Sequence, residues 1–432
     1  MCFSEPWLAD GTGYSCAMVG GTNTSPYPQP LIPPSTIAFP AQGQIIVLPT
    51  NFRTSDSIQW TLSIQHQFPR GWQAQVDYIG SKTNNMPIGT AFDPAVYTPG
   101  TWGPGATGCG PVITTGPAAA AGGTTNPKVG SNCSTTGNEQ ARFALTEANP
   151  AQGNLFQGGS ASAIINDNAF SRYNGMVATL QHRLSSTFSL LTNYTWSKCL
   201  NVYDAQGDQG GNGPMDPYNP SLDYGRCGSD YRNIFNTTVV AKSDFKSLSG
   251  LTGYLANGWE LAPLFHITSG SPINVTDGTD ISLTDIGSDR PNAVPGVNPI
   301  HFVKIQGGTA ANNQANHGYL NPAAFCFNQT SCSNTVAPGT YGDLHRNAIS
   351  GPMFFQFDSQ LSRIWPIHER WSLDTRLEAF NVLNHPSFAN PGSSNPAGGS
   401  FGTITSQAGG AALTNTPTLA ARVFQGSVKV IF

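Results

Sequence analysis

Apolar and polar residues alternate strictly along several segments of this chain. In IQWTLSIQHQF, residues 58–68, the apolar side chains fall on one parity and Gln, Thr and Ser fall on the other. Alternation with period two is typical of a β-strand that has one apolar and one polar face. The segment WQAQVDYIG at 72–80 alternates in the same way after a PRG turn at 69–71. The two segments therefore predict a β-hairpin with a tight turn.

The same pattern recurs along the rest of the chain. Further alternating segments lie at 173–184, 188–198, 235–245, 259–269, 356–365 and 371–383, and the last one ends the chain at 421–432. They are each roughly ten residues long, which is the length that crosses a bilayer as a tilted strand. The pattern therefore predicts about nine antiparallel strands.

The connections between these segments alternate between short and long. Short turns lie at 69–71, 185–186 and 366–370 with a moderate one at 246–257, and long connections lie at 81–171, 199–231, 270–352 and 384–419. All short turns therefore fall at one end of the sheet. Outer-membrane barrels have short periplasmic turns and long outer loops, whereas long loops are uncommon in compact soluble domains. Aromatic residues near strand ends suit the interface girdles of a barrel: Trp60, Phe68, Trp72, Tyr78, Tyr194, Trp196, Trp259, Trp365 and Trp371.

Composition supports a strand-rich chain and narrows its function. The chain has 48 Gly and 33 Pro in 432 residues, which leaves little room for long helices. Only 10% of residues are charged and the net charge is −4, which argues against a nucleic-acid partner. No apolar run approaches the ~18 residues of a transmembrane helix. The first residues lack the basic and apolar regions of a signal peptide.

We therefore predict an all-β fold, an antiparallel up-and-down transmembrane β-barrel segment of about nine strands with long outer loops. An antiparallel barrel needs an even number of strands, so we expect the barrel to be incomplete. Residues 1–55 are predicted to be an extracellular loop segment, and residues 56–432 the C-terminal part of an outer-membrane barrel. Counting hairpins places the C-terminus at the periplasmic end.

Eight cysteines fall in pairs within the predicted outer segments. An even number of cysteines, two to a segment, is typical of local disulfides in an oxidising compartment, although spacing alone leaves the connectivity open. The candidates are Cys2 with Cys16, Cys109 with Cys133, Cys199 with Cys227, and Cys326 with Cys332.

Several segments resemble the C-terminal barrel of TonB-dependent receptors, of the Oar-like acidobacterial type. They are SIQWTLSIQHQF, YNGMVATLQHRLSSTFSLLTNYTWSKCL, DYGRCGSDYRNIFN, GWELAPLFHITSGSPINV, DRPN and RLEAFNVLNHPSFANP. The terminal strand resembles the assembly signal of outer-membrane barrels, carried by Phe424, Val428, Val430 and Phe432. Family members also carry a signal peptide and a plug, which are not visible here. The resemblance implies a C-terminal fragment of a larger receptor, and it implies contact with TonB only through the missing N-terminal region.

Candidate chemistry is sparse. We expect no catalytic residues and no cofactor, because no nucleophile elbow, HExxH or Walker sequence is present. Oxygen-rich loops can bind Ca²⁺, and the weak candidates are Asp277, Asp280, Asp285 and Asp289, although solvated loop carboxylates are the favoured interpretation. Charges that we expect to line the lumen and pair across strands are Asp358, Arg363, Asp374, Arg376 and Glu378.

The predicted function is uptake or surface binding of a large solute by a receptor of TonB-dependent type in the cell outer membrane of a Gram-negative bacterium. The expected partners are the lipid bilayer and the barrel-assembly machinery, and no nucleic acid. The alternative is a secreted all-β binding or adhesion module with disulfide-stapled loops. A β-rich extracellular hydrolase would need a carboxylate pair that the sequence does not place.

Overall fold

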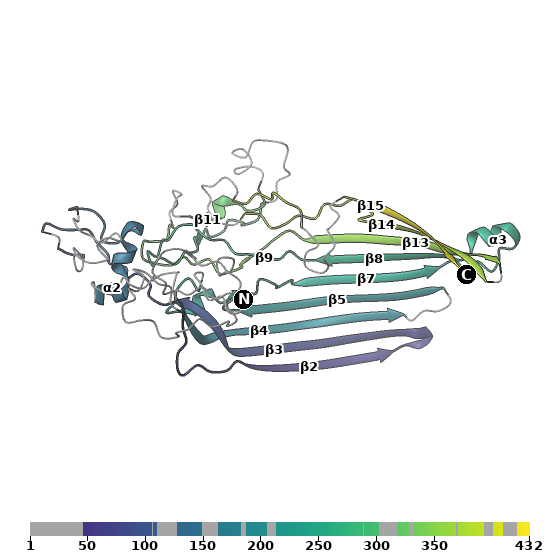
Figure 1. Cartoon of the computed structure of the whole chain (residues 1–432), viewed down its shortest axis with the longest axis horizontal. Helices are drawn as coiled ribbons and strands as arrows, with labels where there is room; N and C mark the ends of the chain where they lie inside the picture. Colours follow the sequence, from purple (N-terminus) through teal and green to yellow (C-terminus); the bar gives the residue numbers. More distant parts are fainter. Residues whose placement is uncertain are drawn as a thin grey trace, which may run out of the picture.

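A computed structural model describes residues 46–105, 107–109, 128–148, 163–182, 187–204, 213–287, 289–301, 318–327, 332, 334–368, 370–392, 401–408 and 421–432. Its main feature is one large antiparallel sheet of long strands that run side by side (Figure 1). The long strands are β2 (Asp56–Gln67), β3 (Trp72–Ala91), β4 (Ala163–His182), β5 (Phe188–Asn201), β7 (Asn233–Lys242), β8 (Trp259–Thr268), β13 (Phe354–His368), β14 (Trp371–Phe380) and β15 (Val423–Ile431). The all-β, antiparallel prediction is confirmed.

The strands follow one another across the sheet nearly in chain order. The order is β15-β14-β13-β8-β7-β5-β4-β3-β2, and the long neighbouring strands are antiparallel throughout. Short strands β1 (Ile46–Val47) and β6 (Gly225–Arg226) pair with the loop-side ends of β4 and β5. β2 and β15 do not pair with each other, so the sheet of the described residues is open and has two edges.

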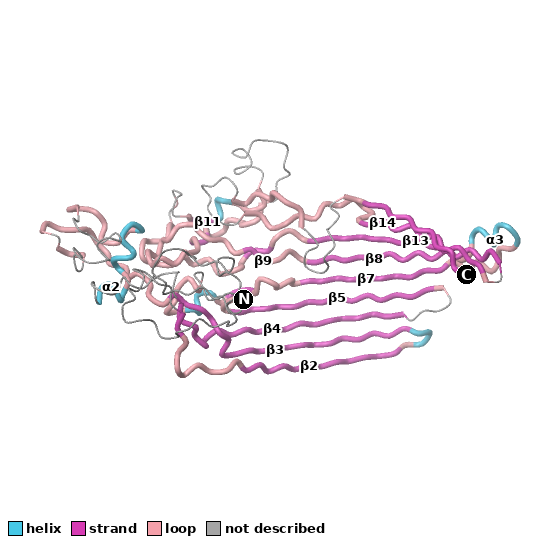
Figure 2. The backbone as a smooth tube through the Cα atoms, viewed as in Figure 1, coloured by secondary structure: helices cyan, strands magenta, loops and turns pink. Residues whose placement is uncertain are grey.

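The connections sort to opposite ends of the sheet. In Figure 1 the short turns and the C-terminus lie at the right, and the long connections lie at the left. Figure 2 shows that the left end is mostly irregular backbone. The turn between β2 and β3 is the 3₁₀ segment Pro69–Gly71, in which Arg70 and Gly71 both adopt positive φ and reverse the chain. The predicted turn at 185–186 lies outside the described residues.

The register keeps most large apolar side chains of the sheet on one surface, which we call the apolar face. One row across the strands runs Leu62–Tyr78–Met176–Trp196. Another runs Leu261–Leu361–Leu377 and ends at Gly426. A slip of one residue between two strands would move the side chains of one strand to the opposite face. The apolar rows continue from strand to strand, so the pairing of neighbouring strands matches the alternation of their residues.

The opposite surface, which we call the polar face, carries mainly Gln, Ser, Thr, Asn and charged side chains. Among the residues that the structure describes, no layer of helices covers either surface. Large apolar side chains such as Leu62 and Ile64 are 61% and 66% exposed. An apolar surface of this extent is uncommon on a soluble monomer. Among the described residues, no helix is both long and apolar enough to span a membrane.

Strands β3 and β4 are longer than the sequence predicted. Each has 20 residues, because β3 continues to Ala91 and β4 begins at Ala163. A bulge near Met86, with Asn85 at φ 52°, interrupts the ladder. Beyond the bulge, Ile88, Ala169 and Val202 form a small core. The alternation fades there because these strand ends pack against loops instead of presenting one apolar face.

The long connections fold into a cap at one end of the sheet, which we call the loop cap. It contains short elements and a core of its own around Leu320, Phe325, Phe327 and Phe401. Its elements are β9 (Pro272–Ile273), β10 (Asn292–Ala293), β11 (Phe325–Cys326), β12 (Ile349–Ser350), η2 (Thr136–Arg142), η5 (Pro220–Asp223), η6 (Pro322–Ala324) and α2 (Ala144–Ala148). A further helix, α3 (Gly250–Ala256), lies at the short-turn end instead.

Candidate functional site

The polar face and the loop cap together form the candidate site. On the polar face, side-chain amides form hydrogen bonds both along one strand and across to the next. The Nε2 atom of Gln75 donates to Asp77 at 2.9 Å, and Asn236 Nδ2 donates to Asn193 Oδ1 at 2.9 Å. His266 Nδ1 shares a hydrogen bond of 2.5 Å with Asn236 Oδ1. These groups leave polar atoms along the face, which suits contact with water or a polar solute.

Four of the five predicted lumen charges lie on the polar face. Asp374, Arg376 and Glu378 pair with Ile364, Ser362 and Gln360 of β13. Asp358 belongs to the same parity and accepts from Asn381 N at 2.8 Å. Within the group, Arg376 Nη2 lies 3.4 Å from Asp374 Oδ2. This contact runs along one strand; across the strands, Arg376 and Glu378 face uncharged partners, whereas Asp374 faces Lys429 of β15.

Arg363 lies on the other face, so its predicted place among the lumen charges is wrong. It pairs with Thr375 in the register, one residue out of phase with Asp374 and Arg376. Its guanidinium stacks 3.6 Å from the centre of the Trp365 ring and donates to the carbonyl of Leu255 at 2.7 Å. The carbonyl of Tyr254 is a second acceptor. Arg363 therefore attaches α3 to the short-turn end of the apolar face.

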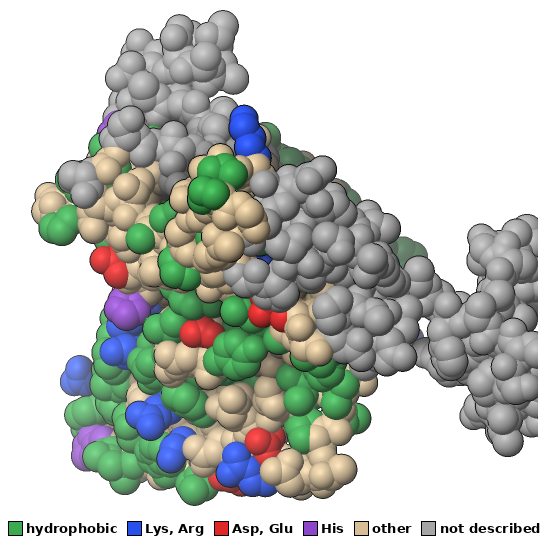
Figure 3. Space-filling model, turned by 90° about the vertical axis from the view of Figure 1, so that its left-hand side faces the viewer, with side chains coloured by type: hydrophobic (Ala, Val, Ile, Leu, Met, Phe, Trp, Pro, Cys, Tyr) green, Lys and Arg blue, Asp and Glu red, His purple; other side chains and the backbone are tan. Residues whose placement is uncertain are grey.

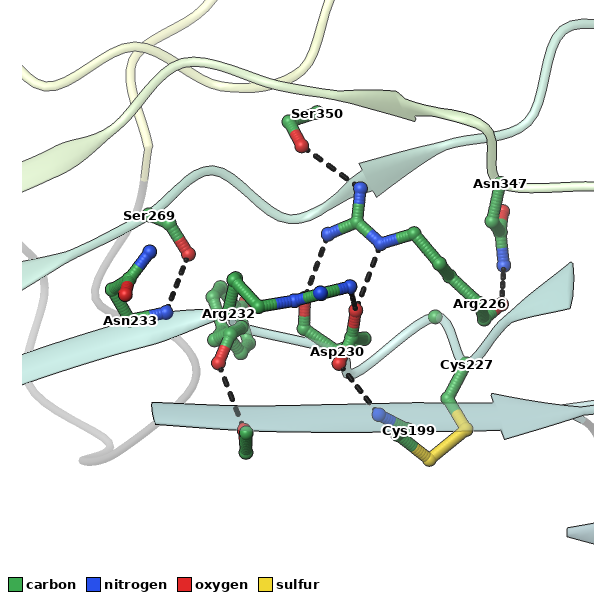
Figure 4. Close-up of polar contacts among 12 residues, drawn as sticks. Cys199, Arg226, Cys227, Asp230, Arg232, Asn233, Ser269, Asn347 and Ser350 are labelled. Carbon is green, nitrogen blue, oxygen red and sulfur yellow. Dashed lines mark hydrogen bonds and ion pairs between the residues drawn. A yellow bond between two sulfur atoms is a disulfide. The ribbon is translucent and has the colours of Figure 1, made fainter. Parts of the chain in front are cut away.

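A buried carboxylate, Asp230, organises the loop cap where it joins β5 (Figure 4). Its Oδ1 accepts from Cys199 N at 2.7 Å, and its Oδ2 lies 2.8 Å from Arg226 Nε and 3.2 Å from Arg232 Nη2. Arg226 also donates to Ser350 Oγ of β12 at 2.8 Å. The cluster thus joins β5, β6 and β12 beside the Cys199–Cys227 disulfide.

Two more arginines join segments that are far apart in sequence. Arg290 is buried and its Nη1 lies 2.5 Å from Asp223 Oδ1. Arg346 is paired with Asp204 and donates to the carbonyl of Asn201 at 2.9 Å. The partners of each ion pair are 67 and 142 residues apart. Buried charges are stable only when they are paired in this way, so the ion pairs fix the loops of the cap against one another.

The described cysteines are bonded within their loops. The pairs are Cys109–Cys133, Cys199–Cys227 and Cys326–Cys332, with Cα atoms 5.1, 5.4 and 5.5 Å apart. Cys199 belongs to β5 itself, because this strand extends to Asn201. Cys109 and Cys133 pack with Trp102 in a small core. Cys2 and Cys16 lie outside the described residues.

The acidic loop at 277–289 is largely buried, so the interpretation of its carboxylates as solvated is wrong. Asp277 and Asp289 are 0% and 1% exposed. The loop needs them as acceptors: Asp289 Oδ2 accepts from Ser282 N at 2.6 Å, and Asp280 Oδ2 accepts from Asp285 N at 2.6 Å. Among the described residues, no group of three or more His, Cys, Asp or Glu side chains has an arrangement that could hold a metal ion.

These carboxylates lie close to Glu139 of η2 and disfavour its charged form. Burial, followed by the charges of Asp280 and Asp285, raises the pKa of Glu139 to about 8. Burial also raises the pKa of Asp289 to about 7 and that of Asp285 to about 6. Arg142, also in η2, contacts the acidic loop as well: it donates to the carbonyl of Leu283 at 3.1 Å. The carboxylates thus form one proton-binding cluster between two loops.

The four residues of the predicted assembly signal share the parity of the last strand that belongs to the apolar face. Phe424, Val428 and Val430 pair with Ala379, Thr375 and Leu373 of β14. Phe432, the last residue, lies beside Trp371, with ring centroids 5.6 Å apart. The strand ends at the short-turn end of the sheet (Figure 1).

Sequence reasoning assigned no role to the arginines of the loop cap. Arg290 and Arg346 each pair with an aspartate that is distant in the sequence, and Arg226 pairs with the buried Asp230. The available signal was compositional: only 10% of the chain is charged, and DYGRCGSD and DRPN concentrate such residues. In a chain with so few charged residues, a charged residue in a loop is a candidate for a buried ion pair.

A comparison with protein families agrees with the fold. The family model described as "Outer membrane beta barrel domain" matches residues 9–425. Among solved structures, the chain is similar to the outer membrane transporter YddB from Escherichia coli, with a TM-score of 0.39 and 8% identity. The similarity covers 90% of this chain and 34% of that transporter, so this chain spans about a third of its length. No curated protein matches the chain.

A two-faced antiparallel sheet, with its short turns at one end and long loops at the other, is the architecture of outer-membrane barrels. Residues 9–425 make up nearly the whole chain. The chain belongs to the outer membrane beta-barrel domain family and is a protein of the bacterial outer membrane.

Proposed function

We propose that this chain forms part of the barrel wall of a receptor of TonB-dependent type, which binds a large solute at its loop cap and takes it up. The observation that carries the proposal is the division of the sheet into an apolar and a polar face, with one folded cap at a single end. In a membrane barrel the apolar face meets lipid and the polar face lines the lumen. A solute then meets the cap first and the polar face second.

The size and order of the cap favour binding rather than simple diffusion. The described part of its loops has its own core, three disulfides and buried ion pairs. A set of loops that served only as connections would not need this degree of order, because order costs conformational entropy. The TonB-dependent type rests on the sequence resemblance of the strands, and the polar face supports a polar solute.

The secreted alternative is not favoured, because the family places the chain in the outer membrane. An exposed apolar face would also have no partner in water. A soluble module with the same strands would need a second layer over Leu62 and Ile64 and their neighbours.

Orientation can be tested with an epitope tag in intact cells. A tag inserted after Gly130, in the loop cap, should be reached by antibody in intact cells. A tag inserted after Arg70, in the β2–β3 turn, should be reached only after the outer membrane is permeabilised. The reverse pattern would contradict the proposed orientation, and access to both sites in culture medium free of cells would support a secreted protein.

Uptake is tested separately in the native bacterium. Cells that lack the gene should lose energy-dependent uptake of at least one large solute from a panel of siderophores, oligosaccharides and peptides. Collapse of the proton gradient with a protonophore should abolish the same uptake in wild-type cells. Uptake that is unchanged by gene deletion across the panel, or that persists without the gradient, would contradict a receptor of TonB-dependent type.

A further inference from the structure

Basic side chains gather on the apolar face next to the loop cap, on strands β3, β4 and β5. Lys82, Arg172 and Lys198 belong to the parity of the apolar face: Lys82 pairs with both Ile58 and Arg172, and Lys198 pairs with Asn174. In Figure 3, which looks onto the loop end, Lys and Arg side chains gather in the lower part of the described surface, where β2 to β4 lie in Figure 1. We call these three residues the basic rim.

The basic rim directly follows a row of exposed aromatic residues. Trp60, Tyr78 and Trp196 are each about 40% exposed on the same face. Lys82 is four residues beyond Tyr78 and Lys198 is two beyond Trp196, which corresponds to about 7–13 Å along the strands. Tyr and Trp side chains favour the boundary between hydrocarbon and head groups. The rim therefore lies at the depth of the head groups on the loop side.

The basic rim has few acidic neighbours that could neutralise its charge. Like charges directly opposite each other on neighbouring strands are destabilising, and Lys82 faces Arg172 in this way. Among the described residues, no ion pair involves Lys82, Arg172 or Lys198. The acidic groups nearby are occupied: Asp167 is paired with Arg53 at 2.9 Å, and Asp56 accepts from the amides of Asn84 and Asn85.

A hollow in the surface connects two of these cations, Lys82 and Arg172. It has a volume of about 280 Å³ and is lined by Arg53, Lys82, Asn84, Asn85, Asp167, Asn168, Ala169, Phe170 and Arg172. The guanidinium of Arg172 lies 5.8 Å from the centre of the Phe170 ring, which holds it over the hollow. Guanidinium, ammonium and amide groups are the donors that phosphate oxygens accept from most readily.

We propose that the basic rim binds the phosphate groups of a phosphorylated lipid of the outer leaflet. The apolar face directly below the rim would contact the acyl chains, and the cations would neutralise the phosphates. A lipid is favoured over a free phosphate because the rim continues into an exposed apolar face. The inference rests on the lipid-facing orientation proposed above, and it does not depend on transport.

Vesicle binding tests the proposal with the purified chain. The chain is reconstituted into phosphatidylethanolamine vesicles that contain either bis-phosphorylated lipid A or the same lipid A after phosphatase treatment. Association of fluorescent lipid A with the protein is measured by energy transfer from the Trp residues. The variant Lys82→Gln/Arg172→Gln/Lys198→Gln is compared with Lys242→Gln/Lys429→Gln, whose substitutions lie on the polar face.

The triple variant should bind bis-phosphorylated lipid A on the order of 100-fold more weakly, since each basic residue near a charged surface contributes roughly fivefold. The polar-face variant should bind like the wild type. Equal weakening in both variants, or equal binding of the dephosphorylated lipid by the wild type, would overturn the proposal. So would displacement of the lipid by inorganic phosphate at low millimolar concentration.

A measurement on the wild type alone tests the proposal even if the variants do not insert into the vesicles. Binding of bis-phosphorylated lipid A should weaken as NaCl is raised from 50 to about 500 mM, because salt screens exposed charges. Binding that is insensitive to salt would overturn the assignment even if no variant folds. Loss of solute uptake without loss of lipid binding would contradict the proposed function and leave this inference standing.

Discussion

The indole of Trp60 fills the space beside Gly80, its direct partner in the β2–β3 ladder, where any side chain on Gly80 would overlap it. A glycine in a strand weakens the strand because it has no side chain to pack. The ring of the opposite residue covers the exposed backbone here. The pair therefore explains why a glycine lies in an otherwise strand-forming segment of the apolar face.

Replacing this glycine should lower the stability of the sheet. Gly80→Val forces the Trp60 ring out of its position, and overpacking of this kind costs about 1–3 kcal/mol. The matched control is Gly426→Val, on the same face of β15, where an added Cβ meets no atom within 4 Å. The measurement is the temperature at which the folded band is lost in a heat-modifiability gel. Equal temperatures for both variants would show that the Trp60 ring does not depend on Gly80.

The terminal residue Phe432 should matter for assembly more than for stability. Its side chain is 88% exposed even though the ring lies beside Trp371, so this packing contributes little. We expect Phe432→Ala to reduce the fraction of chain in the outer membrane several-fold, because an exposed end is accessible to the assembly machinery.

The variant Trp371→Ala separates recognition from packing. It removes the same ring contact and keeps the terminal aromatic, so it should leave the membrane fraction near the wild-type level. The measurement is quantitative immunoblotting of separated outer membranes. If both variants lose the same fraction, the contact between the two rings is the cause, and a terminal signal is not needed.

The buried Arg290–Asp223 ion pair should control the order of the loop cap. Arg290→Met leaves the buried Asp223 carboxylate without its partner, which costs about 3–5 kcal/mol. The double variant Arg290→Met/Asp223→Leu removes both charges and should recover much of that loss. The control is Arg376→Gln, because Arg376 is 42% exposed at 3.4 Å from Asp374 and such pairs contribute about 0–1 kcal/mol.

Hydrogen exchange of the amides in residues 213–230 gives the readout. Arg290→Met should exchange faster there while the strands stay protected. The prediction fails if Arg290→Met and Arg376→Gln exchange at the same rate, or if the double variant is less protected than the single one.

Much of the sheet follows from the sequence because alternation is a local signal. The strands at 58–68 and 259–269 were predicted within two residues of their observed bounds, since both alternate over their whole length. The prediction was wrong for Arg363 because it grouped charged residues that lie on neighbouring strands. It did not ask whether their positions along each strand put them on the same face of the sheet. Residue 363 differs in parity from Asp358, so the two side chains of this strand point to opposite faces.

The loop cap was not predictable from local pattern. Arg346 and Asp204 are 142 residues apart, and neither position differs locally from an ordinary polar loop residue. The sequence of the acidic loop at 277–289 is hydrophilic and predicts a solvated loop, yet other segments bury it and donate hydrogen bonds to its backbone carbonyls. Such burial depends on the meeting of distant segments, and periodicity carries no information about it.

The carboxylate cluster of the cap should make the cap less stable as the pH rises. Burial and the charges of Asp280 and Asp285 raise the pKa of Glu139 from 4.5 to about 8. A raised carboxyl pKa means that the folded cap binds the proton more tightly than the unfolded chain does. Its stability is therefore greatest below about pH 4.5 and declines as the pH rises toward 8. Asp289, with a pKa of about 7, acts in the same direction.

Hydrogen exchange of amides in residues 134–147 and 280–287, corrected for the intrinsic rate, should accordingly be faster at pH 8 than at pH 5. Glu139→Gln removes the carboxyl group of the cluster with the highest pKa. The variant should therefore show a smaller difference in exchange rate between pH 5 and pH 8, and it should exchange more slowly than the wild type at pH 8. Asp343→Asn is the matched control, because this carboxylate accepts from Ala293 N elsewhere in the cap. It should keep the wild-type pH dependence. Faster exchange at pH 5 than at pH 8 would reverse the sign and exclude Glu139 as the controlling group.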